Sequence, residues 1–225
     1  MAELYLVRHG QASFRSDNYD KLSPLGHQQA QWLGEYFRQR NLQVDSILTG
    51  TLVRHRETAE GIAQGLQLSS PDFKVFEGLN EFDFHSLINA YIKQHPAEAL
   101  DRNAPAADFY KLLKKGMQKW SSGELSEGVD ETWQHFEERV RSVIETLQAE
   151  FHGQKIVAVS SGGAIAMVLR QILQAPSQTV IELNLQIKNT AIAHCYFNPK
   201  ALRMTSFNHV PHLDTPEREQ HITYS

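Results

Sequence analysis

Four polar segments of the chain carry side chains suited to binding and transferring an anionic group. They contain, in chain order, Arg8 with His9, Arg54, Glu81, and Ser161 ahead of two glycines. Arginine forks match phosphate oxygens in bidentate pairs, and a helix that begins at glycines offers unpaired N–H groups to an anion. Histidine can act as a nucleophile or proton carrier near neutral pH, and glutamate can protonate a leaving alkoxide if its pKa is raised. Together these residue types predict an anion-transfer site.

Predicted strands lead to all four segments. Strand-like apolar runs cover residues 4–7, 44–48, 73–76 and 155–160. Each polar segment comes at or soon after the end of one run. Because ligands of open parallel sheets bind beyond the carboxyl ends of the strands, we expect the four segments to meet there.

Helical patterns alternate with these strands. Ser23-Pro24 has the form of an N-cap followed by proline in the first turn. Helices are predicted over residues 24–40, 51–65, 130–151 and 162–173, and further strands over residues 180–187, 192–197 and 202–207. This alternation predicts an α/β protein, a three-layer α/β/α sandwich with a mostly parallel sheet.

Residues 86–127 interrupt the alternation with a helical pattern that Pro96 and Pro105 break. We interpret this range as a helical lid inserted over the site, within a single domain that spans residues 1–225. The insertion carries four lysines: Lys111, Lys114, Lys115 and Lys119. Such a run is typical of a solvated helix face, and the alternative is that it steers an acidic substrate.

Composition excludes several classes of protein. The formal net charge is −4, so no global positive field attracts nucleic acid or an anionic membrane. The lone Cys195 excludes an intrachain disulfide and a thiolate-rich zinc site. The chain lacks an apolar run long enough to span a membrane and a start typical of a signal peptide, so we expect a cytoplasmic protein.

The same segments carry a family resemblance. Five segments occur in the order found in one family. They are residues 4–13 with Arg8-His9-Gly10, residues 22–26, residues 54–59, the loop at Glu81 and the turn at residues 160–163. The chain thus resembles, over nearly its whole length, the histidine phosphatase superfamily of phosphoglycerate-mutase-like proteins. The resemblance implies the phosphoglycerate-mutase-like fold.

The resemblance also implies a two-step phosphoryl transfer. His9 would attack phosphorus and become a phosphohistidine, while Arg8 and Arg54 hold the phosphate oxygens. Glu81 would protonate the leaving oxygen and then deprotonate the hydrolytic water. We expect substrate contacts also from Gln11, Ser161 and Gly162. No metal or other cofactor is implied, because the arginines neutralise the charge that magnesium neutralises elsewhere. A small phosphate ester or a phosphoprotein would be the substrate, and a homodimer is compatible with the sequence.

One residue departs from the family pattern. The second histidine of the family stands before the Gly-Gly pair, where this chain has Ser161. A serine offers one neutral hydroxyl on a shorter arm, and loss of one preorganised donor typically costs roughly 10²–10³ in rate. We therefore predict a phosphomonoesterase of weak or restricted activity. Alternatives are a pseudoenzyme that binds a phosphorylated ligand and, less favoured, a mutase.

Two other hypotheses compete for the same residues. Ser161 could be the nucleophile of an α/β-hydrolase, with Asp214 and His221 downstream, but Val159 stands where the nucleophile elbow needs glycine. The pair His209 and His212 suggests a metal site, which the absence of a clear third ligand disfavours.

Overall fold

The computed structural model describes residues 2–13, 20–101 and 104–224. In these residues one sheet has the strand order β3-β2-β4-β1-β5-β6. The strands are β1 (Ala2–Arg8), β2 (Ser46–Thr49), β3 (Phe73–Val75), β4 (Lys155–Ser160), β5 (Ile192–Asn198) and β6 (Ala201–His209). The first four pair in parallel, and β5 and β6 add an antiparallel edge beside β1. The predicted mostly parallel α/β fold is therefore confirmed.

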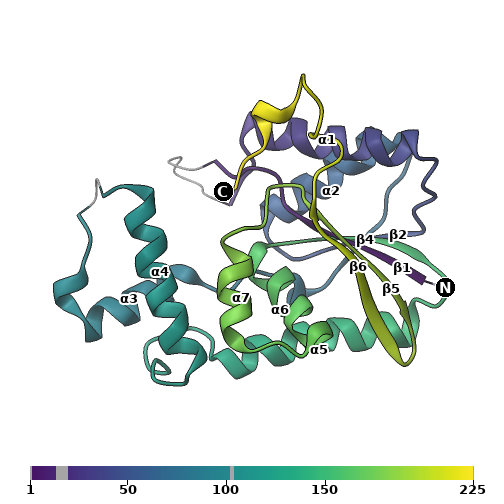
Figure 1. Ribbon diagram of the computed structural model, residues 1–225. Coiled ribbons are helices and arrows are strands. Elements are labelled where there is room, and N and C mark those ends of the chain that lie inside the picture. Colours follow the sequence, from purple (N-terminus) through teal and green to yellow (C-terminus); the bar gives the residue numbers. More distant parts are fainter. Residues whose placement is uncertain (1, 14–19, 102–103, 225) are drawn as a thin grey trace.

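Helices cover both faces of the sheet, as Figure 1 shows. On one face lie α1 (Pro24–Gln39) and α2 (Val53–Leu66), and on the other lie α5 (Trp133–Glu150) and α6 (Gly162–Leu173). The Ser23 hydroxyl accepts from the Gly26 N–H at 3.0 Å, so α1 begins with the predicted cap. Buried side chains of α1 and α2, such as Leu33 and Ile62, form an apolar layer with Val7 and Val157 of the sheet. Burial of these side chains fixes α1 and α2 against the sheet.

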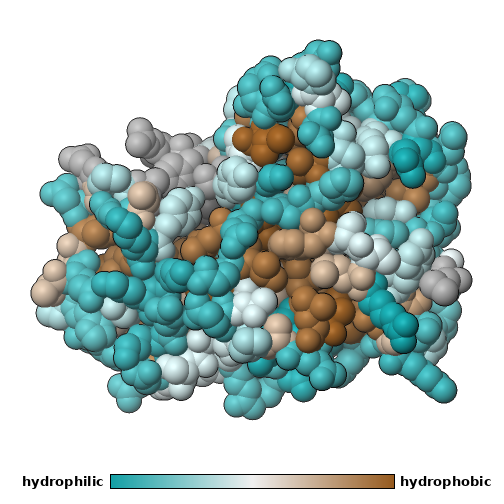
Figure 2. Space-filling model, in the orientation of Figure 1, coloured by the Kyte–Doolittle hydropathy of each residue, from teal (hydrophilic) through white to brown (hydrophobic). Residues whose placement is uncertain are grey.

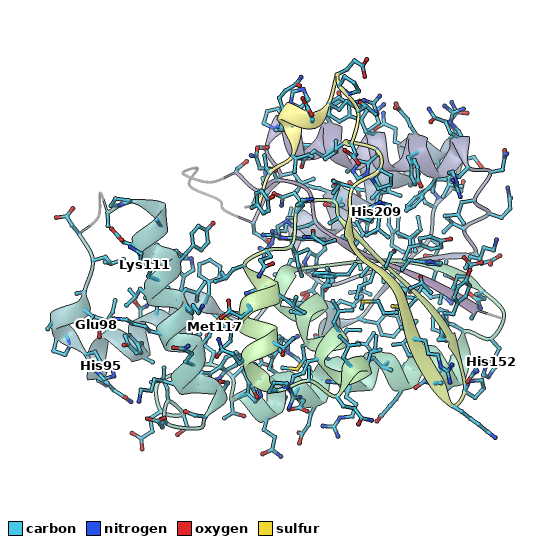
Figure 3. All side chains as sticks on the ribbon, viewed as in Figure 1. His95, Glu98, Lys111, Met117, His152 and His209 are labelled. Atoms are coloured by element: carbon cyan, nitrogen blue, oxygen red, sulfur yellow. The ribbon has the colours of Figure 1, made fainter. Side chains whose placement is uncertain are left out.

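The chain between β3 and α5 forms a separate helical layer to the left of the sheet in Figure 1. It contains α3 (Phe84–Gln94), the short 3₁₀ helix η2 (Pro96–Glu98) and α4 (Ala106–Ser121). The buried Met117 of α4, labelled in Figure 3, contacts the Asn184 amide, and Lys114 pairs with Glu182 at 2.6 Å. Both partners belong to α7 (Ser177–Asn184), so α4 is anchored to the helix that follows α6.

The four lysines of α4 are each paired with a carboxylate. The pairs are Lys111 with Asp108, Lys114 with Glu182, Lys115 with Glu98, and Lys119 with Glu124. Figure 2 shows a mostly hydrophilic surface over α3 and α4, whereas hydrophobic surface gathers between α7 and β6. Paired and exposed lysines are typical of a solvated helix face, which favours that interpretation over substrate steering.

The prediction of a strand over residues 180–187 was wrong. That range contains most of α7, where Val180 and Ile181 are fully buried against the core. Apolar residues at 181, 183 and 185 mimic the alternation of a strand, and a short apolar run cannot separate the two periods. The contacts of α7 with α4 and α6 favour the helix.

Candidate active site

A cavity of about 480 Å³ opens at the carboxyl ends of β1 and β4, between the sheet and the α3–α4 layer. Four of the predicted site residues line it: Arg8, His9, Arg54 and Glu81. The parallel register pairs Arg8 with Ser160, so His9 and Ser161 are the first residues beyond the paired strands. The sheet edge thus gathers segments that are more than one hundred residues apart in the chain.

His9 has one unprotonated ring nitrogen, which accepts a hydrogen bond from Arg54. Its Nδ1 lies 2.7 Å from the Gly10 carbonyl oxygen, and because a carbonyl can only accept, Nδ1 carries the proton. The other nitrogen, Nε2, lies 3.3 Å from the Arg54 Nε and is the unprotonated one. Burial, together with the Arg54 and Arg8 charges, lowers the pKa of His9 well below its ordinary value. The ring is therefore neutral at neutral pH, as a nucleophile must be.

Backbone and carboxylate contacts position both arginines. Arg54 donates from Nη1 to the Asp20 carboxylate at 2.8 Å, and the same carboxylate accepts from the Val53 N–H at the start of α2. Arg8 donates from Nη1 to the carbonyl oxygens of Ile187 and Tyr224, the latter at 2.6 Å. Two guanidinium groups therefore lie beside the His9 ring, where they can bind an oxyanion.

Glu81 accepts two backbone hydrogen bonds at the opposite wall. Its Oε2 lies 3.0 Å from the Gly163 N–H and its Oε1 lies 3.2 Å from the Phe82 N–H. Burial raises the pKa of Glu81, and this exceeds the lowering by those N–H groups and by the arginines. A carboxyl with a raised pKa can carry a proton for a leaving group.

The other three predicted contacts lie outside the cavity lining. The Gln11 side chain accepts from the Ser23 hydroxyl at 2.8 Å. Gly162 lies within the first turn of α6, packed so closely on Asn184 that a Cβ would fall 2.5 Å from its amide oxygen. Ser161 is fully buried, and its hydroxyl lies 2.7 Å from the Nε2 of His55. The cavity lining thus contains the residues predicted for the chemistry but not these three.

Sequence reasoning missed His55 and the apolar cavity wall. His55 is fully buried on α2, and it shares a face with Thr58, Ala59 and Ile62, all fully buried. The spacing of three, four and seven residues places these positions on one helix face, so the buried stripe could have been recognised from the sequence. The cavity wall, built from α3, α4 and the C-terminal tail, leaves no such local signal.

Metal and membrane sites are not found in the described residues. No cluster of three or more His, Cys, Asp or Glu there is arranged to hold a metal ion. His212 bonds instead to the Thr190 hydroxyl at 2.8 Å, while His209 lies on β6 (Figure 3). Every helix in that part of the chain is too short or too polar to cross a bilayer.

A comparison with known protein families identifies the family of this chain. The model of the histidine phosphatase superfamily, branch 1, matches residues 4–210. The chain belongs to the histidine phosphatase superfamily. Phosphatases and mutases that act on phosphate esters make up this superfamily.

Similar proteins within the superfamily include both phosphatases and a probable mutase. The probable phosphoglycerate mutase GpmB of Salmonella typhi is 27% identical over 233 residues, covering 98% of this chain and 99% of that protein. Phosphoserine phosphatase from Entamoeba histolytica superposes with a TM-score of 0.68 at 21% identity, over 95% of this chain and 100% of that one. The α-ribazole phosphatase from Shigella flexneri gives a TM-score of 0.64 at 20% identity, over 92% and 96%. The phosphoglycerate mutase from Bacillus anthracis, with a TM-score of 0.66 at 17% identity over 94% of both chains, shows that the fold is phosphoglycerate-mutase-like.

Proposed function

We propose that this protein is a phosphomonoesterase that works through a phosphohistidine at His9. The observation that carries the proposal is the neutral His9 ring, whose unprotonated Nε2 accepts from Arg54 in the cavity that Glu81 also lines. Nucleophile, cations and acid therefore surround one space large enough for a phosphate ester.

The reaction runs in two steps. The Nε2 of His9 forms a bond to phosphorus as the ester P–O bond breaks, and the Glu81 carboxyl gives its proton to the departing alkoxide. Glu81, now ionised, takes a proton from water as that water attacks the phosphohistidine, which releases inorganic phosphate and restores both residues. Arg8 and Arg54 bind the phosphoryl oxygens, and their charges stabilise the transition state of each step.

Purified protein assayed on a panel of phosphate monoesters tests the proposal. We expect phosphate release from wild type and a loss of at least about 10³-fold in His9→Ala. His152→Ala is the matched control, since this exposed histidine lies far from α3 and α4 (Figure 3). Protein denatured at alkaline pH during turnover should retain phosphate on His9, and hydrolysis that survives in His9→Ala would contradict the proposal.

A mutase is the second candidate function, favoured by the similarity to GpmB over almost the whole chain. The phosphohistidine would then pass its phosphoryl group to a second alcohol in place of water. Incubation with 3-phosphoglycerate separates the two functions, because a mutase produces 2-phosphoglycerate and a phosphatase produces inorganic phosphate.

By the family resemblance, Ser161 stands where the family carries its second histidine, and this serine supports a restricted rate. A third role, binding without turnover, is compatible with the same residue. Binding of an ester without any trapped phosphohistidine would favour that role. Detection of the phosphohistidine would favour catalysis.

A further inference from the structure

The cavity extends well beyond the space that a phosphate occupies. Its volume of about 480 Å³ falls in the range of roughly 300–1,000 Å³ typical of pockets that bury a whole small molecule. Its cationic residues among the described lining, Arg8 and Arg54, both lie at the His9 end. The remaining space must therefore receive the alcohol portion of the ester.

Apolar side chains from α3, α4 and the end of α7 form much of the remaining wall. Phe84 of α3 and Phe109 of α4 meet edge to face, with ring centroids 6.2 Å apart and planes at 88°. Leu113 lies one helical turn beyond Phe109, and Leu185 closes the wall from the end of α7. Such a wall gains free energy by covering apolar surface, and the polar groups that line the cavity beside it, His85, Tyr110 and Asn184, include no arginine or lysine for a second anionic group.

We infer that the substrate is the monophosphate ester of an apolar alcohol, whose alkyl or aromatic group lies against Phe84, Phe109 and Leu113. The inference rests on the proposed phosphatase function. A small carboxylated ester such as 3-phosphoglycerate would place its carboxylate against this wall, where the described lining supplies no further arginine or lysine.

A series of primary alkyl phosphates tests the inference, because the leaving alkoxide stays nearly constant while the apolar group grows. We expect kcat/KM to rise by about fourfold per methylene from ethyl to hexyl phosphate, as for a buried CH₂. The esters 2-phenylethyl phosphate and hexyl phosphate should both exceed glycerol 3-phosphate and 3-phosphoglycerate.

Variants of the wall locate the effect. Phe109→Ala and Leu113→Ala should each reduce the rise per methylene, whereas Leu173→Ala, an exposed leucine at the end of α6, should not. A flat or falling series with His9-dependent hydrolysis would overturn the substrate class alone. An absence of both hydrolysis and phosphohistidine would overturn the proposed function as well.

A second and independent observation concerns His55. Its ring is fully buried, with its centroid 5.8 Å from that of His9, and Nε2 lies 2.7 Å from the Ser161 hydroxyl. Its Nδ1 is buried without a hydrogen-bond partner among the described residues. Gly50 makes room for the ring, because a Cβ there would lie 2.4 Å from Nδ1. The chain thus provides space for a second imidazole, supplied by α2, beside the nucleophile.

The lack of a partner at Nδ1 favours one direction for the hydrogen bond between His55 and Ser161. If the Nε2–H of His55 donates to Ser161, the unpartnered Nδ1 is a bare acceptor and the serine proton remains available. The opposite arrangement would bury an orphaned N–H donor, which folded proteins rarely do. The geometry points to His55 as a positioning residue that joins α2 to the start of α6 through the buried Ser161 hydroxyl, and so fixes the structure behind the His9 ring.

A double-mutant cycle tests this role. His55→Ala and Ser161→Ala should each lower kcat by roughly 10²-fold, and the double variant should lose no more than the worse single variant. Ser161→His alone should not help, since His55 occupies the adjacent space, but Ser161→His combined with His55→Ala should recover activity relative to His55→Ala. The role would be overturned if the losses of kcat in His55→Ala and Ser161→Ala multiply in their double variant. It would also be overturned if the variant that combines Ser161→His with His55→Ala keeps the wild-type melting temperature but recovers no activity.

Discussion

Protonation of two side chains governs the expected chemistry at the scale of the residue. Burial acts on both in opposite senses, since it lowers the pKa of His9 and raises the pKa of Glu81. Each shift favours the uncharged form that the first step uses. The arginines reinforce the effect on His9 and oppose it on Glu81, so the desolvation of the carboxyl has to exceed their influence.

These two shifts predict a bell-shaped pH dependence of kcat/KM. The acid limb reports protonation of His9 and should lie well below its ordinary pKa of 6.5. The alkaline limb reports ionisation of Glu81 and should lie above its ordinary value of 4.5. Rates of an alkyl ester measured across the pH range check both limbs, and an alkaline limb that persists in Glu81→Gln would exclude Glu81 as its source.

The role of Glu81 as acid predicts a dependence on the leaving group. Glu81→Gln should slow phosphohistidine formation from alkyl phosphates by about 10²–10⁴-fold. Formation from 4-nitrophenyl phosphate should slow far less, because a nitrophenolate leaves without a proton. Rapid mixing measures the two rates, and Asp83→Asn in the same loop is the matched control, since Asp83 caps α3 instead of lining the cavity. Equal losses for both esters would contradict the role of Glu81 as acid.

The same carboxyl links activity to stability. Because its folded-state pKa is raised, Glu81 contributes stability below its unfolded pKa that is lost as the pH rises through the folded pKa. Glu81→Gln should therefore raise the melting temperature relative to wild type more at about pH 8 than at about pH 5. A difference of the opposite sign would show that the carboxyl is not desolvated.

At the scale of the element, the start of α6 positions the acid. The Gly163 N–H bonds to Glu81, and a Cβ at residue 163 would lie 2.2 Å from the Glu81 Oε1 and 2.7 Å from the Phe82 ring. The close approach of helix and loop therefore requires a glycine at this position.

Gly163→Ala should displace the Glu81 carboxyl and lower kcat by at least about tenfold. Gly116→Ala on α4 is the matched control, because a Cβ there meets its nearest atom at an ordinary 3.6 Å. That control should keep its kinetics and gain about 0.5–1 kcal/mol of unfolding free energy from helix propensity. Steady-state kinetics and thermal melts distinguish the two, and full activity in Gly163→Ala would contradict the positioning role.

At the scale of the whole molecule, the C-terminal tail completes the site. It passes α1 and returns toward the carboxyl ends of the strands in Figure 1. Tyr224 accepts from Arg8 through its carbonyl oxygen, and Thr223 bonds both to Gln29 of α1 and to Asn189. Asn189 in turn donates to the His9 carbonyl oxygen at 3.2 Å. Residues from both ends of the described chain thus hold the loop that carries His9.

Removal of residues 223–225 should release Arg8 and weaken phosphate binding. We expect the inhibition constant of inorganic phosphate to rise by about tenfold, corresponding to about 1.4 kcal/mol. Tyr224→Phe keeps both the carbonyl and the ring and should leave that constant unchanged. An unchanged inhibition constant in the truncated protein would show that Arg8 stays in place without Tyr224.

Local patterns were enough to predict the order of strands and helices as far as α6 and the segment Arg8-His9, because strands, caps and the polar residues that follow them are encoded by neighbours in the chain. Tertiary contacts decided the rest. The state of Glu81 depends on burial, α7 became a helix through its contacts with α4 and α6, and His55 pairs with Ser161 across more than one hundred residues. Such contacts involve segments far apart in sequence, and their free energies leave no trace in any single local window.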